Sequence, residues 1–245
     1  MKIGFGVMVN SFVRLDMVLK QSEIDGTMHF VEEPESATKG LNRLLGIIEA
    51  EHADVAVLTH QDMDYRSPWL AHIQNQIGKL PDSWIVAGII GKDMQGRICG
   101  RFHDTRITPI FDTSDLHVFP QPASCFDECC ILVNLAKGFR FDETLDGFDL
   151  YGTLCVLQAW EVGGTAWILD SGAYSVLVNT KYGECRVDFA LAQHRCMLPF
   201  TWFPDERFCR TFKWLHDRFP KAARIDSTVL GVPKEQEAAI GSENN

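Results

Sequence analysis

Hydrophobic and polar residues alternate in blocks along the first half of the chain, in a way that predicts strands and helices in turn. Short apolar runs bounded by polar residues have the length of buried strands, and the longer segments carry apolar residues at helical spacing, as Leu41, Leu44 and Ile48 do. The predicted strands are residues 2–9, 28–33 and 54–60, and the predicted helices are residues 15–21 and 34–53.

The second half continues the pattern and then becomes less regular. Residues 92–124 read as loops or a hairpin, and the aromatic-rich segment 200–219 reads as one helix packed on the body. The remaining predicted elements are helices at 69–80 and 151–162 and strands at 84–91, 128–134 and 165–171. Strands that alternate with helices predict an α/β fold, with a mostly parallel sheet flanked by helices. We therefore predict a single domain over residues 1–232 and a polar, disordered tail over residues 233–245.

Composition and charge narrow the range of ligands. Hydrophobic residues make up 46% and charged residues 23% of the chain, which is the balance of a packed globular protein. The formal net charge is −10, with 33 acidic and 23 basic residues. This balance argues against a nucleic-acid binder, because phosphate backbones are held by clustered Lys and Arg. A polyanionic ligand such as a nucleotide diphosphate needs a divalent cation or a local basic patch here.

The cysteines and the N-terminal residues bear on the cellular compartment of the protein. The eight cysteines form no CxxC pairs, and most lie in apolar runs, where a buried free thiol acts as a small hydrophobe. The first 16 residues lack the long apolar stretch of a secretory signal, and no apolar run approaches the ~20 residues of a membrane-spanning helix. We predict a soluble, cytoplasmic protein with no membrane span, and a homo-oligomer stays open.

The segment VAVLTHQDMDYRSPWL combines a buried strand with candidate metal ligands. His60, Asp62 and Asp64 follow the apolar run directly and alternate, which predicts that they project to one side if strand geometry persists. In open α/β sheets the ligand site lies beyond the carboxyl ends of the strands. Carboxylate oxygens suit Mg²⁺ or Mn²⁺, which can bridge to a diphosphate. The alternative is a solvated loop whose acidic residues merely end the strand.

Several segments in this order resemble the glycosyltransferases of the GT-A fold, of the broad family 2 type. The resemblance is closest to a small bacterial branch in which an HQD triplet replaces the acidic DxD motif, and it spans roughly residues 3–175. The matching segments are EEPESATKGLN (32–42), AVLTHQDMDY, DSWIVAGIIGKDMQGRICG, FDECCILVN (126–134), GFRFDETLDGFDLYGTLCVLQAWEVGG (138–164) and TAWILDS (165–171).

The resemblance implies a Rossmann-like GT-A domain that moves a sugar from a nucleotide-diphosphate sugar to a glycan or other hydroxyl acceptor. It places Asn10, Glu33 and Asn42 near the nucleotide, and His60 and Asp62 at the metal or the diphosphate. Asp64 either helps to hold the metal or is solvated. The metal is expected to be Mn²⁺ or Mg²⁺. Alternatively, Asn42 is a helix-surface amide and Glu33 a loop carboxylate.

Such a transfer needs a group that stabilises the leaving diphosphate, a role for the metal, and, if the anomeric configuration inverts, a base for the acceptor hydroxyl. The candidate bases are Asp127, Glu128, Asp146 and Asp149. Asp149 has an alternative role as the N-cap of the helix that begins beside it.

The chain departs from the family pattern where activity depends on it. GFDLYGTLC stands in place of GFHLYGTDLC, so that Asp149 replaces a histidine and Leu154 replaces an acidic residue. Tyr174 stands near the place of a histidine that can complete the metal site. These departures raise a second hypothesis, a catalytically degenerate nucleotide-sugar or glycan-binding protein that keeps the fold.

Two further readings are weaker. A phosphohydrolase or nucleotidyltransferase that uses Asp62 with Asp64 would need more acidic ligands and a basic residue on the phosphate, for which Lys92 and Arg97 are the available side chains. The isolated histidines are interpreted as structural, because they have no partners at ligand spacing in the sequence; they are His103, His117 and His194.

Overall fold

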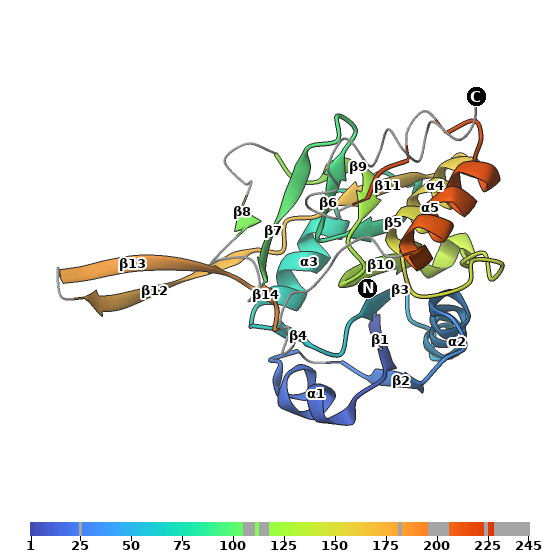
Figure 1. Ribbon diagram of the computed structural model, residues 1–245. Coiled ribbons are helices and arrows are strands. Elements are labelled where there is room, and N and C mark those ends of the chain that lie inside the picture. Colours follow the sequence, from blue (N-terminus) through green and yellow to red (C-terminus); the bar gives the residue numbers. More distant parts are fainter. Residues whose placement is uncertain are drawn as a thin grey trace.

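A twisted mixed sheet runs through the centre of the computed structural model (Figure 1). The structure describes residues 1–24, 26–104, 111–112, 118–180, 183–195, 206–222 and 225–227. In chain order, the first five strands are β1 (Ile3–Val9), β2 (Met28–Glu32), β3 (Val55–Thr59), β4 (Met63–Tyr65) and β5 (Trp84–Gly88). The later strands are β6 (Ile90–Asp93), β7 (Ile98–Asp104), β8 (Phe111–Asp112), β9 (Gln121–Phe126), β10 (Cys130–Asn134), β11 (Thr165–Ile168), β12 (Ala173–Thr180), β13 (Gly183–Ala190) and β14 (Ala192–His194).

The order of strands in the sheet brings several carboxyl ends to one edge. The sheet order is β2-β1-β3-β10-β5-β11-β9-β6-β7-β14-β4, with β8 beside β7. Strand β1 is parallel to both β2 and β3, and β11 is parallel to β5. Strand β10 lies between β3 and β5 and is antiparallel to both, so β3 and β5 share one direction. The chain therefore leaves β1, β2, β3, β5 and β11 at the same edge.

Helices cover both faces of this sheet. The α-helices are α1 (Phe12–Met17), α2 (Ala37–Ala50), α3 (Trp69–Ile77), α4 (Tyr151–Glu161) and α5 (Glu206–Arg218), with short 3₁₀ turns at Leu19–Gln21 and Leu135–Lys137. Helices α2, α4 and α5 share one apolar core with the sheet, while α1 and α3 contribute to the core on the other side. Gly4 lets α2 approach β1 closely, since a Cβ there would lie 2.5 Å from Ile48 Cγ2. Both cores hold the sheet rigid behind its carboxyl edge.

The strand between residues 84 and 91 and the segment after it differ in detail from the sequence prediction. The predicted strand divides into β5 and β6 on either side of Ile89, and the segment predicted as loops or a hairpin contains the end of β6, then β7, β8 and most of β9. Strand β6 pairs with both β7 and β9. The predicted strand at 128–134 is present as β10, but it is antiparallel. The α/β class with flanking helices is confirmed, and the sheet is mixed.

A long hairpin, which the sequence did not predict, carries the chain from β11 to β14. Strands β12 and β13 pair antiparallel from Ala173 with Ala190 to Thr180 with Gly183. Figure 1 shows this hairpin extending away from the sheet. After it, β14 returns to the sheet and pairs parallel to β7 and antiparallel to β4. This return positions His194, the last residue of β14.

The C-terminal helix packs as predicted, within the residues that can be compared. In α5, Phe208 and Leu215 are buried against the core shared with α4. Residues 200–205 of the predicted helix, and the predicted tail at 233–245, lie outside the described residues. Among the helices of the described ranges, none is long and apolar enough to cross a membrane.

Candidate metal centre

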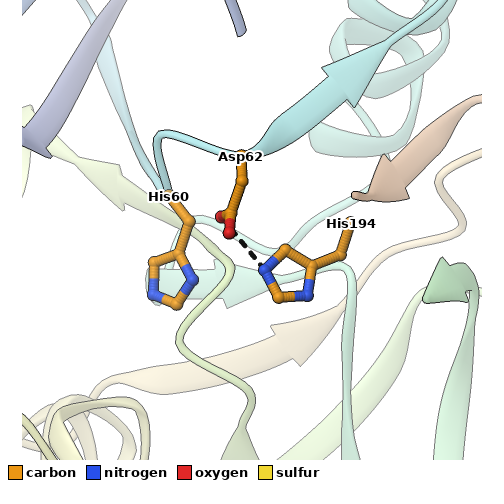
Figure 2. Close-up of side chains that lie close together, drawn as sticks. All are labelled: His60, Asp62 and His194. Carbon is orange, nitrogen blue, oxygen red and sulfur yellow. Dashed lines mark hydrogen bonds and ion pairs between the residues drawn. The ribbon is translucent and has the colours of Figure 1, made fainter. Parts of the chain in front are cut away.

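Three potential metal ligands converge just beyond the end of β3. His60 and Asp62 lie in the turn between β3 and β4, and His194 reaches them from the end of β14 (Figure 2). The Nε2 atom of His194 lies 3.0 Å from Asp62 Oδ1. One ligand atom from each of the three side chains lies within 4.8 Å of the others. Asp62 and His194 are each 7% exposed, whereas His60 is half-buried.

Backbone pairing between β4 and β14 holds His194 in this position. His194 is the register partner of Met63, and the amide of Arg195 donates to the carbonyl of Asp62 at 2.9 Å. This short stretch of backbone pairing therefore fixes Asp62 and His194 relative to each other. A side-chain contact reinforces the pairing, because Arg195 Nη2 lies 2.6 Å from Asp64 Oδ2.

Asp64 is a partner of two arginines and lies outside the three-residue group. Its Oδ2 accepts from Arg66 Nη2 at 2.7 Å, besides the contact with Arg195. The carboxylate is 4% exposed, so the guanidinium groups offset the cost of burying it. The structure brings His60 and Asp62 together as the sequence predicted, and it gives Asp64 this structural pairing.

The electrostatics of Asp62 favour its ionised form. Burial alone would raise the pKa of its carboxyl, but the hydrogen bond and the charge of His194, with the charge of His60, together lower the pKa below its ordinary value. An ionised carboxylate between two imidazoles is a competent cation ligand. Because its pKa is lowered, the Asp62 carboxyl is already ionised near neutral pH.

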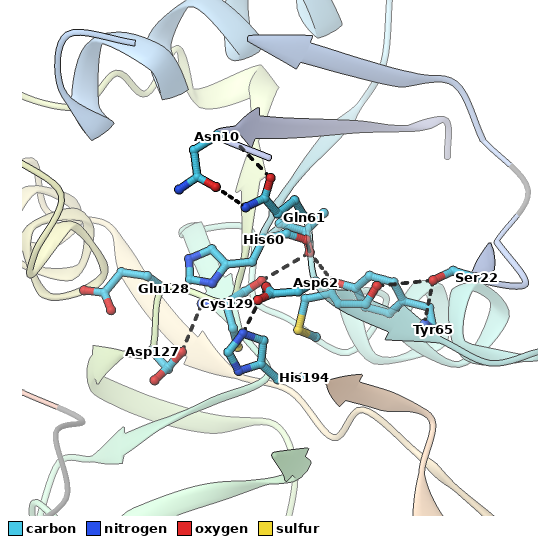
Figure 3. A network of polar contacts seen from close by, with 12 residues as sticks. Asn10, Ser22, His60, Gln61, Asp62, Tyr65, Asp127, Glu128, Cys129 and His194 are labelled. Carbon is cyan, nitrogen blue, oxygen red and sulfur yellow. Dashed lines mark hydrogen bonds and ion pairs between the residues drawn. The ribbon is translucent and has the colours of Figure 1, made fainter. Parts of the chain in front are cut away.

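Gln61, between the two predicted ligands, fastens the first loop of the chain to the turn after β3. Its Oε1 accepts from the backbone amides of Asn10 at 3.2 Å and Ser11 at 3.0 Å. Its Nε2 donates to Asn10 Oδ1 (Figure 3). The amide side chain therefore satisfies both peptide N–H groups where β1 ends, and it orients Asn10.

A cavity of about 650 Å³ opens beside these residues. Asn10 follows β1, Glu33 follows β2 and His60 follows β3, and all three line it. Glu33 adopts a φ of 38°, a left-handed conformation that L-residues rarely take. Arg14 and Arg207 bring positive charge to the same wall. The cavity thus lies at the carboxyl edge of the parallel strands, where ligands of open α/β sheets bind.

Of the predicted candidate bases, Glu128 lines the cavity. Burial is the main cause that raises the pKa of its carboxyl to about 8, and the neighbouring charge of Asp127 raises it further. Asp127 accepts from the amide of Cys129 at 3.0 Å. Asp146 is exposed and Asp149 is bound by Arg207 Nε at 2.6 Å. Only Glu128 among the four is a lining residue.

The N-cap role considered for Asp149 is wrong. Helix α4 begins after Leu150, which is the N-cap residue with a φ of 62°, and no side chain caps the helix. Asp149 instead pairs with Arg207 from α5 at the edge of the cavity. The pair joins α5 to the segment before α4.

Asn42 and Leu154 have roles in packing. The Asn42 amide exchanges hydrogen bonds with the backbone of Phe141, at 2.9 Å and 2.8 Å, and donates to Glu143. It therefore connects α2 to the loop after β10 and is not a lining residue of the cavity. Leu154 is fully buried in α4, where a carboxylate would be costly without a partner.

His194 was interpreted from the sequence as a structural histidine, and the structure places it in the candidate metal group. Its separation from Asp62 by 132 residues hid the pairing. The concern that Tyr174 leaves the site without a second imidazole also loses its basis, since His194 supplies one. Of the other isolated histidines, His103 lies on β7 with its ring 6.3 Å from that of Phe189, and His117 lies outside the described residues.

The donor set fits a divalent cation. Imidazole nitrogens suit transition metals, and a carboxylate oxygen suits Mg²⁺, Ca²⁺ or Mn²⁺, so a mixed set favours a metal that accepts both. With three protein ligands, positions remain for water or a ligand's oxygen atoms. The third reading from the sequence, with Asp62 and Asp64 as paired metal ligands, does not match this geometry, because Asp64 faces Arg66 and Arg195.

Comparison with solved structures identifies the fold of this chain. A structure of GalNAc-T7 with UDP, GalNAc and Mn²⁺ matches with a TM-score of 0.54 and 9% identity, over 89% of this chain and 48% of that one. A structure of S. aureus TarS 1–349 in complex with UDP-GlcNAc matches with a TM-score of 0.53 and 10% identity, over 99% of this chain and 71% of that one. The chain has the GT-A glycosyltransferase fold.

Other comparisons show how much of the matched proteins this chain covers. A longer S. aureus TarS structure matches with a TM-score of 0.51 and 12% identity, over 99% of this chain and 42% of that one. This GT-A chain therefore spans less than half of the matched GalNAc-T7 and longer TarS structures. No model of a known protein family matches the sequence, and no curated protein matches it. At these identities the likeness establishes the fold.

Proposed function

We propose that this protein is a glycosyltransferase that moves a sugar from a nucleotide-diphosphate sugar to a hydroxyl of a glycan or another acceptor. One observation carries the proposal: the His60–Asp62–His194 group borders a cavity at the carboxyl edge of a GT-A sheet. The HQD triplet that resembles a small bacterial branch of family 2 supports it further.

The donor has a consistent place in this cavity. His60, Asp62 and His194 would hold a divalent cation, which would supply the positive charge that offsets the charge developing on the leaving diphosphate. Asn10 and Glu33, at the ends of β1 and β2, would contact the nucleotide. Arg14 and Arg207 add positive charge along the wall, which suits a diphosphate in a chain of net charge −10.

Glu128 is the base that we assign to the acceptor hydroxyl. It lines the cavity, and because the pKa of its carboxyl is raised to about 8, its ionised form is a stronger proton acceptor than an ordinary glutamate and predominates above about pH 8. It replaces the acidic residue expected at the position of Leu154. The buried Leu154 side chain in α4 is then a packing residue, and its presence does not remove the base from the cavity.

The cation is expected to be Mn²⁺ rather than Mg²⁺. Mg²⁺ prefers oxygen ligands and keeps several waters, whereas two of the three side chains here offer imidazole nitrogen. Donor turnover should therefore be faster with Mn²⁺ than with Mg²⁺ at equal concentration.

The test is a panel of UDP-, GDP- and dTDP-sugars incubated with the protein and Mn²⁺, followed by detection of the released nucleoside diphosphate. Release from at least one donor, lost in Asp62→Asn and retained in the exposed-surface variant Asp82→Asn, is the expected result. Absence of release or transfer with every donor, by protein that is folded and binds Mn²⁺, would contradict a transferase.

The second candidate is a degenerate nucleotide-sugar or glycan-binding protein, and the buried Leu154 favours it. Calorimetry with the donor panel separates the two. Donor binding that is unaffected by EDTA, without product release, would favour the binding protein over the metal-dependent enzyme.

A further inference from the structure

Tyr151, the first residue of α4, contacts the Nε2 atom of His60. The Tyr151 hydroxyl lies 3.0 Å from His60 Nε2 and 3.4 Å from the backbone carbonyl oxygen of Glu128. The tyrosine lines the cavity but is only 3% exposed, and a buried tyrosine hydroxyl usually bonds to protein atoms. These two atoms are the partners that the structure provides.

The two contacts differ in what they allow. A carbonyl oxygen can only accept, so the Tyr151 hydroxyl donates its hydrogen bond to the backbone carbonyl oxygen of Glu128. The hydroxyl oxygen then accepts from His60, and His60 Nε2 carries the ring proton. In a neutral imidazole the other nitrogen, Nδ1, is left with its lone pair.

Figure 2 shows which way the two ring nitrogens of His60 face. One nitrogen faces Asp62, and the other lies on the opposite side of the ring. The nitrogen that faces Asp62 is bonded to the ring carbon that carries the side chain, so it is Nδ1, and Nε2 is the atom that contacts Tyr151. The tautomer selected by Tyr151 therefore directs a lone pair into the three-residue group. The opposite tautomer would direct an N–H bond into it and exclude a cation there.

The backbone around Tyr151 is shaped to hold it at this distance. Leu150, just before it, takes the rare left-handed conformation with a φ of 62°. Gly152, just after it, lets the start of α4 approach β9, since a Cβ there would lie 2.4 Å from the carbonyl oxygen of Phe126. A left-handed non-glycine residue costs energy and occurs where the surrounding structure requires it. Here Leu150 directly precedes the residue that contacts His60.

We propose that Tyr151 is a positioning residue that fixes His60 as the Nε2–H tautomer and so prepares His60 Nδ1 as a metal ligand. This inference rests on the proposed function, which supplies the cation. A ligating histidine commonly donates its second ring N–H to a hydrogen-bond partner, and loss of that partner typically weakens metal affinity 10- to 100-fold.

The first measurement uses the wild-type protein without metal or nucleotide. Nitrogen-15 chemical shifts of the histidine rings distinguish the two tautomers, and comparison with His60→Gln assigns the His60 signals. The expected result is the Nε2–H tautomer for His60. The Nδ1–H tautomer would overturn the proposal, whether or not the protein transfers sugars.

The second measurement compares Tyr151→Phe with Tyr65→Phe. Tyr65 is a matched control because it is also fully buried, and its hydroxyl bonds to Thr59 Oγ1 at 2.6 Å and not to a histidine. Tyr151→Phe should mix the His60 tautomers and weaken Mn²⁺ binding roughly 10- to 100-fold, while Tyr65→Phe leaves both unchanged.

The outcomes separate this proposal from the proposed function. Wild-type Mn²⁺ affinity and an unmixed tautomer in Tyr151→Phe would overturn the role of Tyr151 and leave the transferase standing. An Nε2–H tautomer that depends on Tyr151, in a protein that binds no Mn²⁺, would support the hydrogen bond from His60 to Tyr151 and contradict the metal site.

Discussion

Individual side chains at the candidate site divide into candidate metal ligands and residues that hold those candidates in place. His60 and Asp62 lie in one turn, whereas His194 arrives 132 positions after Asp62. Gln61, between the first two, faces away to the loop after β1. The HQD triplet thus places Gln61, which binds the loop after β1, between the two candidate ligands His60 and Asp62. An amide suits this middle position because it can both accept from and donate to that loop.

The connector role of Gln61 predicts a loss of stability on substitution. Gln61→Leu keeps the approximate size of the side chain but leaves the amides of Asn10 and Ser11 without their acceptor, so the free energy of unfolding should fall by about 1–3 kcal/mol. Denaturant unfolding measures the change. The exposed Gln95→Leu should change it by less than about 0.5 kcal/mol. Equal effects of the two variants would contradict the role of Gln61.

Glu128 predicts a pH dependence of stability in metal-free protein. Its folded-state pKa is raised to about 8 from 4.5, so the folded protein keeps a proton that the unfolded chain releases. The contribution of this group is fully present below pH 4.5 and is lost as pH rises toward 8. Glu128→Gln should therefore gain stability over wild type by on the order of 1 kcal/mol per pH unit between these values.

Unfolding in denaturant with EDTA, at a series of pH values, checks this trend. Glu206→Gln is the control, because the Glu206 side chain is 97% exposed and the variant should follow the wild type. A constant difference between Glu128→Gln and wild type across that range would show that Glu128 ionises normally.

At the scale of elements, the site depends on how β14 meets β4. The strands share only three register pairs, and the Asp64 carboxylate adds ion pairs to Arg66 and Arg195 on the two sides of the contact. Hydrogen bonds to a nearly buried carboxylate are strong, whereas exposed ion pairs contribute little. Asp64 therefore supports the position of His194 without joining the metal group.

Removal of this carboxylate should loosen β14. We expect Asp64→Ala to lower the free energy of unfolding by about 1–3 kcal/mol and to speed hydrogen exchange at residues 192–194. Asp217→Ala, which breaks an exposed pair with Lys213, should cost less than about 1 kcal/mol. Unchanged exchange at β14 in Asp64→Ala would contradict the proposed support.

Sequence patterns predicted the elements that local physics determines. Strands β1, β2 and β3 and helix α2 were predictable because apolar runs and helical spacing arise within one segment. Strand β10 was predicted as a strand, but its antiparallel direction depends on pairing with β3 and β5 far away in the sequence. The β12–β13 hairpin was missed, because no turn signal was recognised between two runs of alternating residues.

The candidate site was predictable only in part for the same reason. His60 and Asp62 were found because they follow a buried strand at its carboxyl end. His194 required the return of β14 to β4, a contact across the chain that no spacing encodes. The short apolar segment before it, LAQH at residues 191–194, was the available signal for a strand that ends in a ligand.

On the proposed function, the molecule combines a strongly acidic chain with a cavity that takes an anionic donor. A net charge of −10 disfavours binding of a nucleotide diphosphate, and a cation at Asp62 reverses the local field. The two cores on either side of the sheet keep the cavity walls fixed, so binding depends on this local charge. Metal and nucleotide should then bind as a coupled pair.

Calorimetry of UDP and GDP with and without Mn²⁺ tests the coupling. We expect at least a tenfold tighter affinity for one of these nucleotides when Mn²⁺ is present, which corresponds to about 1.4 kcal/mol of coupling. The reciprocal titration should show the same factor for Mn²⁺. Equal nucleotide affinity in Mn²⁺ and in EDTA would show that the metal takes no part in binding.

A titration of Mn²⁺ followed by electron paramagnetic resonance tests the central claim most directly. The account predicts one bound Mn²⁺ per chain, with affinity reduced at least tenfold in each of His60→Ala, Asp62→Asn and His194→Ala and retained in Asp82→Asn. The absence of specific Mn²⁺ binding by the folded wild type, or wild-type affinity in His194→Ala, would contradict it.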